Sequence, residues 1–161
     1  MQAVFLSWVE HSWLAALVND STWMFPTLEA LHFLGLILLM GSLIVVDLRL
    51  MGVGAEAPVN AVIRFIPWSM VGFVINLVSG VMFFASDPSN YYFNTAFRLK
   101  MLAVLLAGLN LIWFKRSIHP LIVAGGDGHV ELPASASVIG GASLFLWLSV
   151  IVFGRLIPYL P

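Results

Sequence analysis

The feature that most constrains this chain is a set of four continuous apolar segments, each about 20 residues long, the length that a helix needs to cross about 30 Å of hydrocarbon. The segments show no alternation of polar and apolar residues, which argues against the strands of a membrane barrel. Only 9% of the 161 residues are charged, whereas a soluble domain carries about 25%. The sequence therefore predicts an all-α integral membrane four-helix bundle, with residues 1–161 as a single domain. The expected spans are residues 25–46, 63–85, 96–114 and 137–157.

Residues 1–20 are expected to form an amphipathic helix that precedes the bundle. Apolar side chains recur at helical spacing from Phe5 to Leu17, whereas Glu10 and His11 lie to one side. Three tryptophans occur in or just after this segment, and tryptophan favours the boundary between membrane and water. We therefore expect an interfacial helix. The alternative is a fifth, oblique membrane helix, for which the segment is short.

The distribution of Lys and Arg predicts the orientation of the chain. More Lys and Arg residues lie around the connections that follow the first and third spans than on the opposite side of the bundle. Because basic residues are retained in the cytoplasm, we expect a bacterial cytoplasmic (inner) membrane protein with both termini in the periplasm. The residues are Arg49, Arg64, Lys115 and Arg116 on the cytoplasmic side, and Arg98 and Arg155 on the periplasmic side.

The composition excludes several classes of function. The formal net charge is −1 and no run of Lys or Arg is present, so we expect no nucleic-acid partner. The chain has no cysteine, which excludes disulfides, thiolate metal ligands and thiol catalysis. No nucleophile paired with a base, no glycine-rich phosphate loop and no metalloprotease motif occurs. We therefore name no catalytic residue and favour an accessory membrane subunit over an enzyme.

The few polar residues inside the spans are the candidates for function, because each is unfavourable in hydrocarbon. Glu29 and His32 are three residues apart and share one face of the first helix, near the expected periplasmic boundary. Lys100 and Met82 are expected at a similar depth on other helices. A His nitrogen and a Met thioether suit copper or a haem iron, with a carboxylate to orient the His. The sequence thus predicts a cofactor site at His32, Lys100 and Met82, with His32 and Glu29 as candidate metal ligands.

The same residues are equally compatible with a chain that binds no cofactor. In that case a Glu29–Lys100 ion pair, with His32 as a hydrogen-bonded neighbour, would hold the helices together. A single Glu-x-x-His motif does not define a di-iron bundle, which needs two such motifs and further carboxylates. Sequence alone leaves both interpretations open.

Other polar residues are expected to have structural roles. Asp47 and Arg49 follow the first expected span and Arg64 opens the second, which predicts an Asp–Arg pair beside the lipid headgroups. Asn110, deep in the third span, is expected to hydrogen bond across helices. Asn76 and Arg155 complete this group.

Several short motifs are distributed over the bundle, and their pattern resembles a known family. They are Leu31-His32-Phe33 with Met40-Gly41, the stretch from Arg64-Phe65 to Ser79-Gly80, and Lys100 with Asn110, Lys115-Arg116 and Pro120. This pattern resembles the copper-resistance D family of bacterial membrane proteins. The resemblance implies copper handling or haem-linked redox chemistry, with His32 and Lys100 as functional residues.

Two further resemblances qualify this interpretation. A His in one helix and a Lys in the third is similar to the haem-containing bacterial membrane protoporphyrinogen oxidase. Asp47-Leu48-Arg49, however, replaces the aromatic and Arg signature expected after the His of that enzyme. The whole chain, including its closing Gly154-Arg155, is most similar to an uncharacterised group of small four-helix bacterial membrane proteins.

These observations together predict a non-catalytic membrane subunit. It would bind haem b or copper near the periplasmic face and act with a redox or copper-handling protein partner. The alternatives are a structural or assembly subunit without a cofactor, and a small copper or proton transporter. A transporter would need a polar path, and only Asn76, Ser79 and Asn110 are expected to line the middle of the bundle. Small residues on several helices are also compatible with a homo-oligomer.

Overall fold

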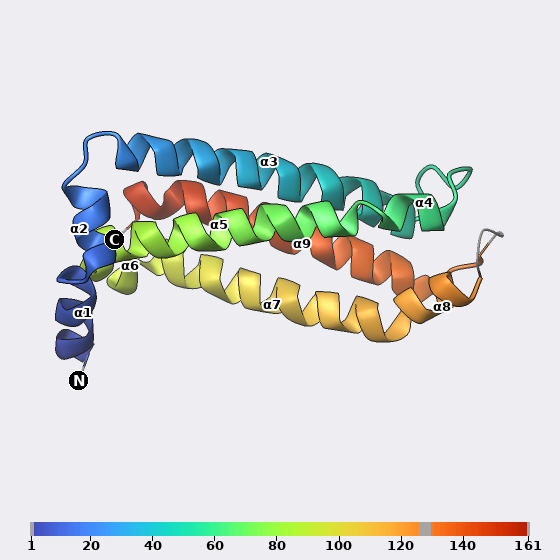
Figure 1. Ribbon diagram of the computed structural model, residues 1–161. Helices are drawn as coiled ribbons and strands as arrows, with labels where there is room; N and C mark the ends of the chain where they lie inside the picture. Colours follow the sequence, from blue (N-terminus) through green and yellow to red (C-terminus); the bar gives the residue numbers. More distant parts are fainter. Residues whose placement is uncertain (1, 126–129, 161) are drawn as a thin grey trace.

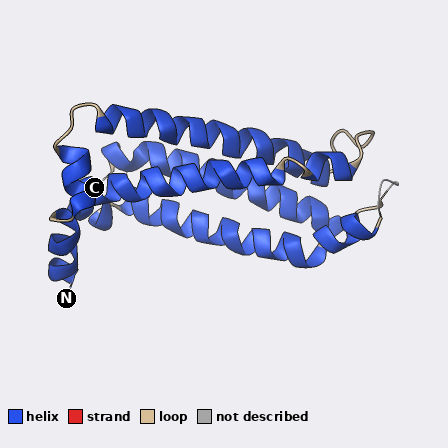
Figure 2. Cartoon of the chain, viewed as in Figure 1, coloured by secondary structure: helices blue, strands red, loops and turns tan. Residues whose placement is uncertain are grey.

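A computed structural model describes residues 2–125 and 130–160 of the chain. Within these ranges most residues are helical and no β-strand occurs (Figure 2). Four long apolar helical segments run side by side as a bundle (Figure 1). Each is long and apolar enough to cross a membrane, by length and composition. The predicted all-α four-helix bundle is confirmed.

The four segments extend further than the spans expected from the sequence. α3 continues through Asp47 and Arg49, which were expected to follow the helix. It stops before Gly52 and Gly54, whose φ angles of +91° and +66° suit glycine and end the helical path. The segments are α3 (Met24–Leu50); α4 (Val59–Ile63) with α5 (Ile66–Ser86); α7 (Thr95–Ser117) with α8 (His119–Ala124); and α9 (Ala134–Leu156) with the 3-10 turn η1 (Ile157–Tyr159).

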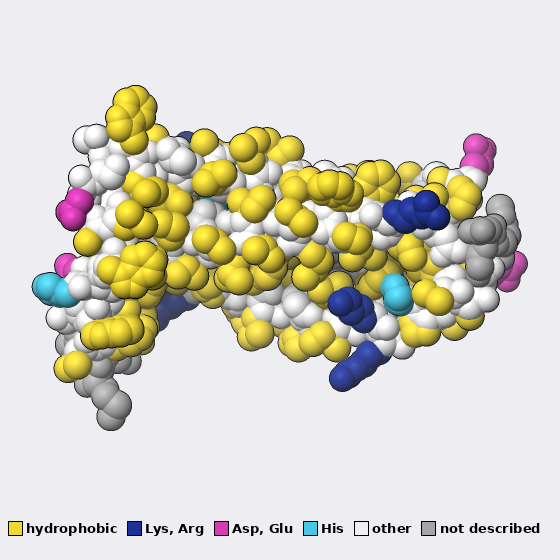
Figure 3. All heavy atoms as spheres, viewed as in Figure 1, with side chains coloured by type: hydrophobic (Ala, Val, Ile, Leu, Met, Phe, Trp, Pro, Cys, Tyr) yellow, Lys and Arg dark blue, Asp and Glu magenta, His cyan; other side chains and the backbone are white. Residues whose placement is uncertain are grey.

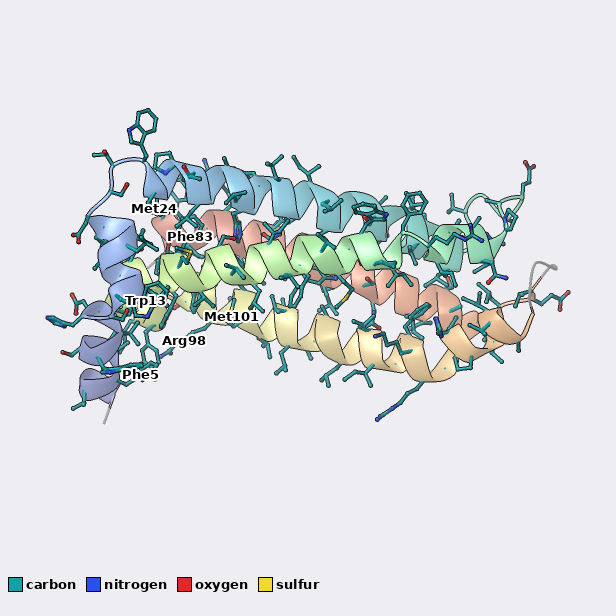
Figure 4. The ribbon with its side chains drawn as sticks, in the orientation of Figure 1. Phe5, Trp13, Met24, Phe83, Arg98 and Met101 are labelled. Carbon is teal, nitrogen blue, oxygen red and sulfur yellow. The ribbon has the colours of Figure 1, made fainter. Side chains whose placement is uncertain are left out.

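The amino-terminal segment forms two short helices, not one. α1 (Gln2–Glu10) and α2 (Trp13–Asn19) are separated where the Ser12 side chain accepts a hydrogen bond from the Ala15 N–H and caps α2. Both helices run across the end of the bundle, beside α6 (Pro88–Phe93) (Figure 1). Trp13 is 73% exposed and lies at the same end as Phe5 and Arg98 (Figure 4). Exposed aromatic side chains on a helix across the bundle end are typical of an interfacial helix.

Close helix packing depends on glycine at two contacts. A Cβ on Gly72 of α5 would lie 2.5 Å from the Leu39 backbone nitrogen of α3. A Cβ on Gly140 of α9 would lie 2.7 Å from the Asp47 carbonyl oxygen of α3. The bundle consequently consists of an α3–α5 pair and an α7–α9 pair that meet through α3 and α9. Direct packing between α5 and α7 is sparse, so this side of the bundle is less tightly closed.

The two ends of the bundle are closed differently. At the end with α1 and α2, the Asn94 Nδ2 donates to the Ile157 carbonyl at 2.9 Å and joins the start of α7 to the end of α9. The end with α4 and α8 is closed by an apolar core that includes Ile118, Ile122 and Ile139. Between the ends, hydrophobic side chains cover much of the face shown in Figure 3. Such an exterior is compatible with surrounding lipid.

Candidate functional site

The candidate site starts with a contact between α3 and α5. His32 Nδ1 and Ser79 Oγ are 2.8 Å apart. The Ser79 hydroxyl also lies 2.7 Å from the Ile75 carbonyl oxygen, one turn earlier on α5. A hydroxyl has one proton to donate and a carbonyl only accepts, so Ser79 donates to Ile75 and accepts from His32. This pattern assigns the ring proton to Nδ1 and leaves the Nε2 of the neutral ring with a free lone pair.

A pair of aromatic side chains borders this half-buried imidazole on one side. The ring of Phe83 meets His32 edge to face, with centroids 5.7 Å apart. Phe25 packs on the other side of Phe83 at 5.3 Å. Phe83 lies near the end of α5, close to where α2 crosses the bundle (Figure 4). Among the described residues, none makes a hydrogen bond to His32 Nε2. The arrangement therefore holds the ring by one nitrogen and leaves the other available.

Lys100 of α7 brings a positive charge to the same site. It is half-buried and lies close enough to His32 for its charge to act on the ring. A Cβ added to Gly154 of α9 would lie 3.4 Å from Lys100 Nζ, so the absence of a side chain there accommodates the ammonium group. Within residues 2–125 and 130–160, no carboxylate forms an ion pair with Lys100. Lys100 therefore presents an unneutralised cation beside His32.

The other predicted ligands do not complete a metal site. Glu29 is exposed and forms no ion pair with Lys100, so the expected Glu29–Lys100 pair is wrong. The role expected of Glu29, orienting the imidazole, belongs to Ser79. Met82 is half-buried, and no hydrogen bond joins it to His32 in the part of the chain that the structure describes. No group of three His, Cys, Asp or Glu residues able to hold a metal ion occurs among these residues.

Glu29 instead belongs to the surroundings of Tyr91 on α6, outside the spans. Burial raises the pKa of the Tyr91 hydroxyl, and the negative charges of Asp87 and Glu29 raise this pKa further. The Tyr91 ring packs edge to face on Phe97 of α7, with centroids 5.5 Å apart. Tyr91 is thus a neutral phenol that borders the end of the bundle with α1 and α2 (Figure 1).

At the opposite end, the expected Asp–Arg pair is not formed. Arg49 Nε donates to the Ala57 carbonyl at 2.8 Å and thereby braces the loop after α3. Asp47 is buried inside the bundle, where its carboxyl group meets Ser143 of α9. Arg64 is exposed. The pair was expected because the first span was predicted to end before Asp47. In the structure α3 continues past Asp47, and the Asp47 side chain lies in the bundle interior.

Three further polar residues have structural contacts. Asn110 Nδ2 donates to the Ile139 carbonyl of α9 at 3.0 Å, which confirms the expected hydrogen bond across helices. Asn76 Nδ2 bonds within its own helix, to the Gly72 carbonyl at 2.9 Å. Arg155 lies over the ring of Tyr159, 5.6 Å from its centroid. These contacts give no continuous polar path through the described part of the bundle.

Comparison with known proteins gives a family for almost the whole chain. A family model described as a family of unknown function, DUF6644, matches residues 5–160. The chain therefore belongs to the DUF6644 family. No curated protein and no solved structure gives a significant match.

Proposed function

We propose that this DUF6644 protein is a haem-binding subunit of the bacterial cytoplasmic membrane, in which His32 would hold the haem iron. The free lone pair on His32 Nε2 carries the proposal. Metal-binding histidines usually donate their other ring N–H to a second group, which fixes the tautomer and orients the ring. Ser79 accepts that N–H in this chain, so the imidazole is oriented for a ligand.

Lys100 favours haem over a bare copper ion. An unpaired ammonium group repels a metal cation but attracts a carboxylate, and haem carries propionate carboxylates. Copper would also need further ligands from this chain, and the described residues supply no cluster for it. His32 for the iron and Lys100 for a propionate would together fit haem b. When bound, haem would supply one-electron redox chemistry.

One chain offers one oriented His on the outer half of α3, beside Phe25 and Phe83. A redox partner or a second copy of the chain would supply the further contacts that a bound haem needs. The resemblance to the copper-resistance D family is compatible with this role and remains a hypothesis about ancestry.

A structural or assembly subunit without a cofactor is the second candidate. It is favoured by the close glycine contacts and by the His32–Ser79 hydrogen bond, which would strengthen the α3–α5 pair in their own right. Under this alternative, His32 and Lys100 serve packing only. A copper or proton transporter ranks third, because Asn76 bonds within its own helix and Asn110 bonds the α9 backbone.

A haem titration separates the first two candidates. We expect the protein, produced without haem and purified in detergent, to bind hemin with a saturable Soret shift and a 1:1 ratio. His32→Ala should weaken binding at least 100-fold, and Lys100→Met about tenfold through loss of a charge-assisted contact worth about 1.5 kcal/mol.

His119→Ala is the matched control, because His119 lies on α8 at the opposite end of the bundle. It should bind hemin as the unchanged protein does. Equal hemin affinity in His32→Ala and the unchanged protein would rule out the proposal, and melting temperatures measured in parallel would identify a purely structural role for His32.

We also propose that both termini face the periplasm. Lys and Arg side chains gather toward the end of the bundle with α4 and α8 in the view of Figure 3, and basic ends remain cytoplasmic. The chain has no cysteine, so single cysteines report their side unambiguously. In intact spheroplasts an impermeant thiol reagent should label Asp20→Cys and leave Ala55→Cys unlabelled. The opposite labelling would reverse the orientation.

A further inference from the structure

The half of the bundle near α4 and α8 contains a cavity of about 140 Å³. α3, α5, α7 and α9 all contribute to its lining, which is mainly apolar. The cavity adjoins the side where α5 and α7 pack sparsely. Its position on α3 is centred near Asp47, 15 residues or about 22 Å along the helix from His32. It is therefore separate from the proposed haem site.

Asp47 is the only acidic residue among those that line this cavity. The residue is 3% exposed. Its carboxyl group meets the Ser143 side chain, but Oδ2 is buried and has no hydrogen-bond partner within residues 2–125 and 130–160. A buried carboxyl oxygen without a donor is strongly unfavourable. A cavity that held only apolar groups would not need a carboxyl group in its lining.

None of the neighbouring polar groups that the structure describes donates a hydrogen bond to Asp47 Oδ2. Ser69 also lines the cavity, but its hydroxyl donates to the Ile66 carbonyl at 2.7 Å. The Asn110 amide donates to the Ile139 carbonyl. Arg49, two residues along α3, donates to the loop carbonyls of Ala55 and Ala57. A donor group on a molecule that enters the cavity would satisfy this oxygen.

We propose that this cavity binds a small hydrophobic amine, with its ammonium group on Asp47 and its apolar body among the helices. The volume sets the size, because apolar cavities of about 150 Å³ in other proteins accept a single benzene ring. Met70 and Gly108 line the cavity and are exposed on α5 and α7. Ligands that partition into lipid would enter between these two helices.

Benzylamine and toluene are the probes, because they share a ring and differ in the ammonium group. The readout is the melting temperature of the detergent-solubilised protein as a function of probe concentration. The concentrations of the two probes are matched for their partition into empty micelles. We expect saturable stabilisation by benzylamine, at concentrations at least tenfold below those needed for toluene. Asp47→Asn should remove this preference. Asp87→Asn, at an exposed carboxylate on the other end, should keep it.

Gly108→Leu gives a second test that does not alter Asp47. A Cβ on Gly108 meets no other atom within 4 Å, so the helix tolerates the change, and we expect the larger side chain of this lining residue to reduce the space for a ligand. This variant should lose stabilisation by both probes. Stabilisation that persists equally in Asp47→Asn and Gly108→Leu would show partition into detergent, and no stabilisation of the unchanged protein would show a cavity that holds only water; either result overturns the proposal.

Discussion

In each half of the bundle one ionisable side chain of α3 contacts a serine of a neighbouring helix, and the two are held in opposite ways. His32 has its ring proton accepted by Ser79 and keeps a free nitrogen. Asp47 contacts Ser143 but has an oxygen without any donor among the described residues. His32 is thus ready to donate an electron pair, whereas Asp47 needs a hydrogen-bond donor or a cation.

The helix pairs explain this difference. His32 lies at the α3–α5 contact, where the Gly72 backbone approach brings the two helices close together. Asp47 lies where α3 meets α9 and where the sparse α5–α7 contact leaves a cavity. The α3–α5 contact therefore provides a hydrogen-bond partner for His32, whereas the cavity beside the α3–α9 contact leaves one oxygen of Asp47 unmatched.

The largest effect is expected from breaking the close α3–α5 contact. Gly72→Ala places a methyl group against the Leu39 backbone, and we expect a loss of about 3 kcal/mol in the free energy of unfolding. The His32–Ser79 contact should weaken with it, because both lie on this helix pair. Unfolding in mixed detergent micelles measures the loss.

Gly80→Ala is the control for that change. Gly80 is on the same helix and a Cβ there meets open space, so the variant should be unchanged or stabilised by up to about 1 kcal/mol through helix propensity. Equal losses in the two variants would contradict the proposed close contact.

Smaller changes in the free energy of unfolding are expected from replacing His32 and Asp47 of α3, with opposite signs for the two residues. Asp47→Leu removes the unmatched oxygen and extends into the cavity, so it should stabilise the protein by about 2 kcal/mol in the absence of ligand. His32→Leu removes a satisfied hydrogen bond and should destabilise it by about 1 kcal/mol. The same unfolding assay compares them, and a destabilised Asp47→Leu would indicate that Asp47 already has a partner.

The smallest effect is expected at Ser79. Ser79→Ala removes the acceptor that orients the His32 ring but leaves Nε2 in place. Loss of such a supporting group lowers metal affinity about tenfold, so hemin affinity should fall by that factor while the melting temperature changes little. An affinity unchanged in Ser79→Ala would show that the hydrogen bond does not orient the ligand.

The sequence predicts the bundle well because a membrane span leaves a strong signal of length and hydropathy. It also places His32, Lys100 and Met82 at a similar depth by counting from the helix ends. The choice of Ser79 over Glu29 as the partner of His32 is not predictable in this way, since it depends on helix rotation. Glu29 is exposed and near Tyr91 instead.

The position of Asp47 explains why the sequence does not predict the cavity near α4 and α8. A charged residue after an apolar run is ordinarily the end of a span, so Asp47 and Arg49 were expected at the headgroups. In the structure α3 continues to Leu50, and close approach of Gly140 brings α9 against this turn. The burial of Asp47 thus depends on contacts between segments far apart in the sequence.

The most direct test of the central claim is the visible spectrum and iron content of the protein purified from haem-replete bacterial membranes. The proposal predicts a Soret band and stoichiometric iron in the unchanged protein and in His119→Ala, with both lost in His32→Ala. A colourless, folded protein without iron, or a Soret band that persists in His32→Ala, would contradict it.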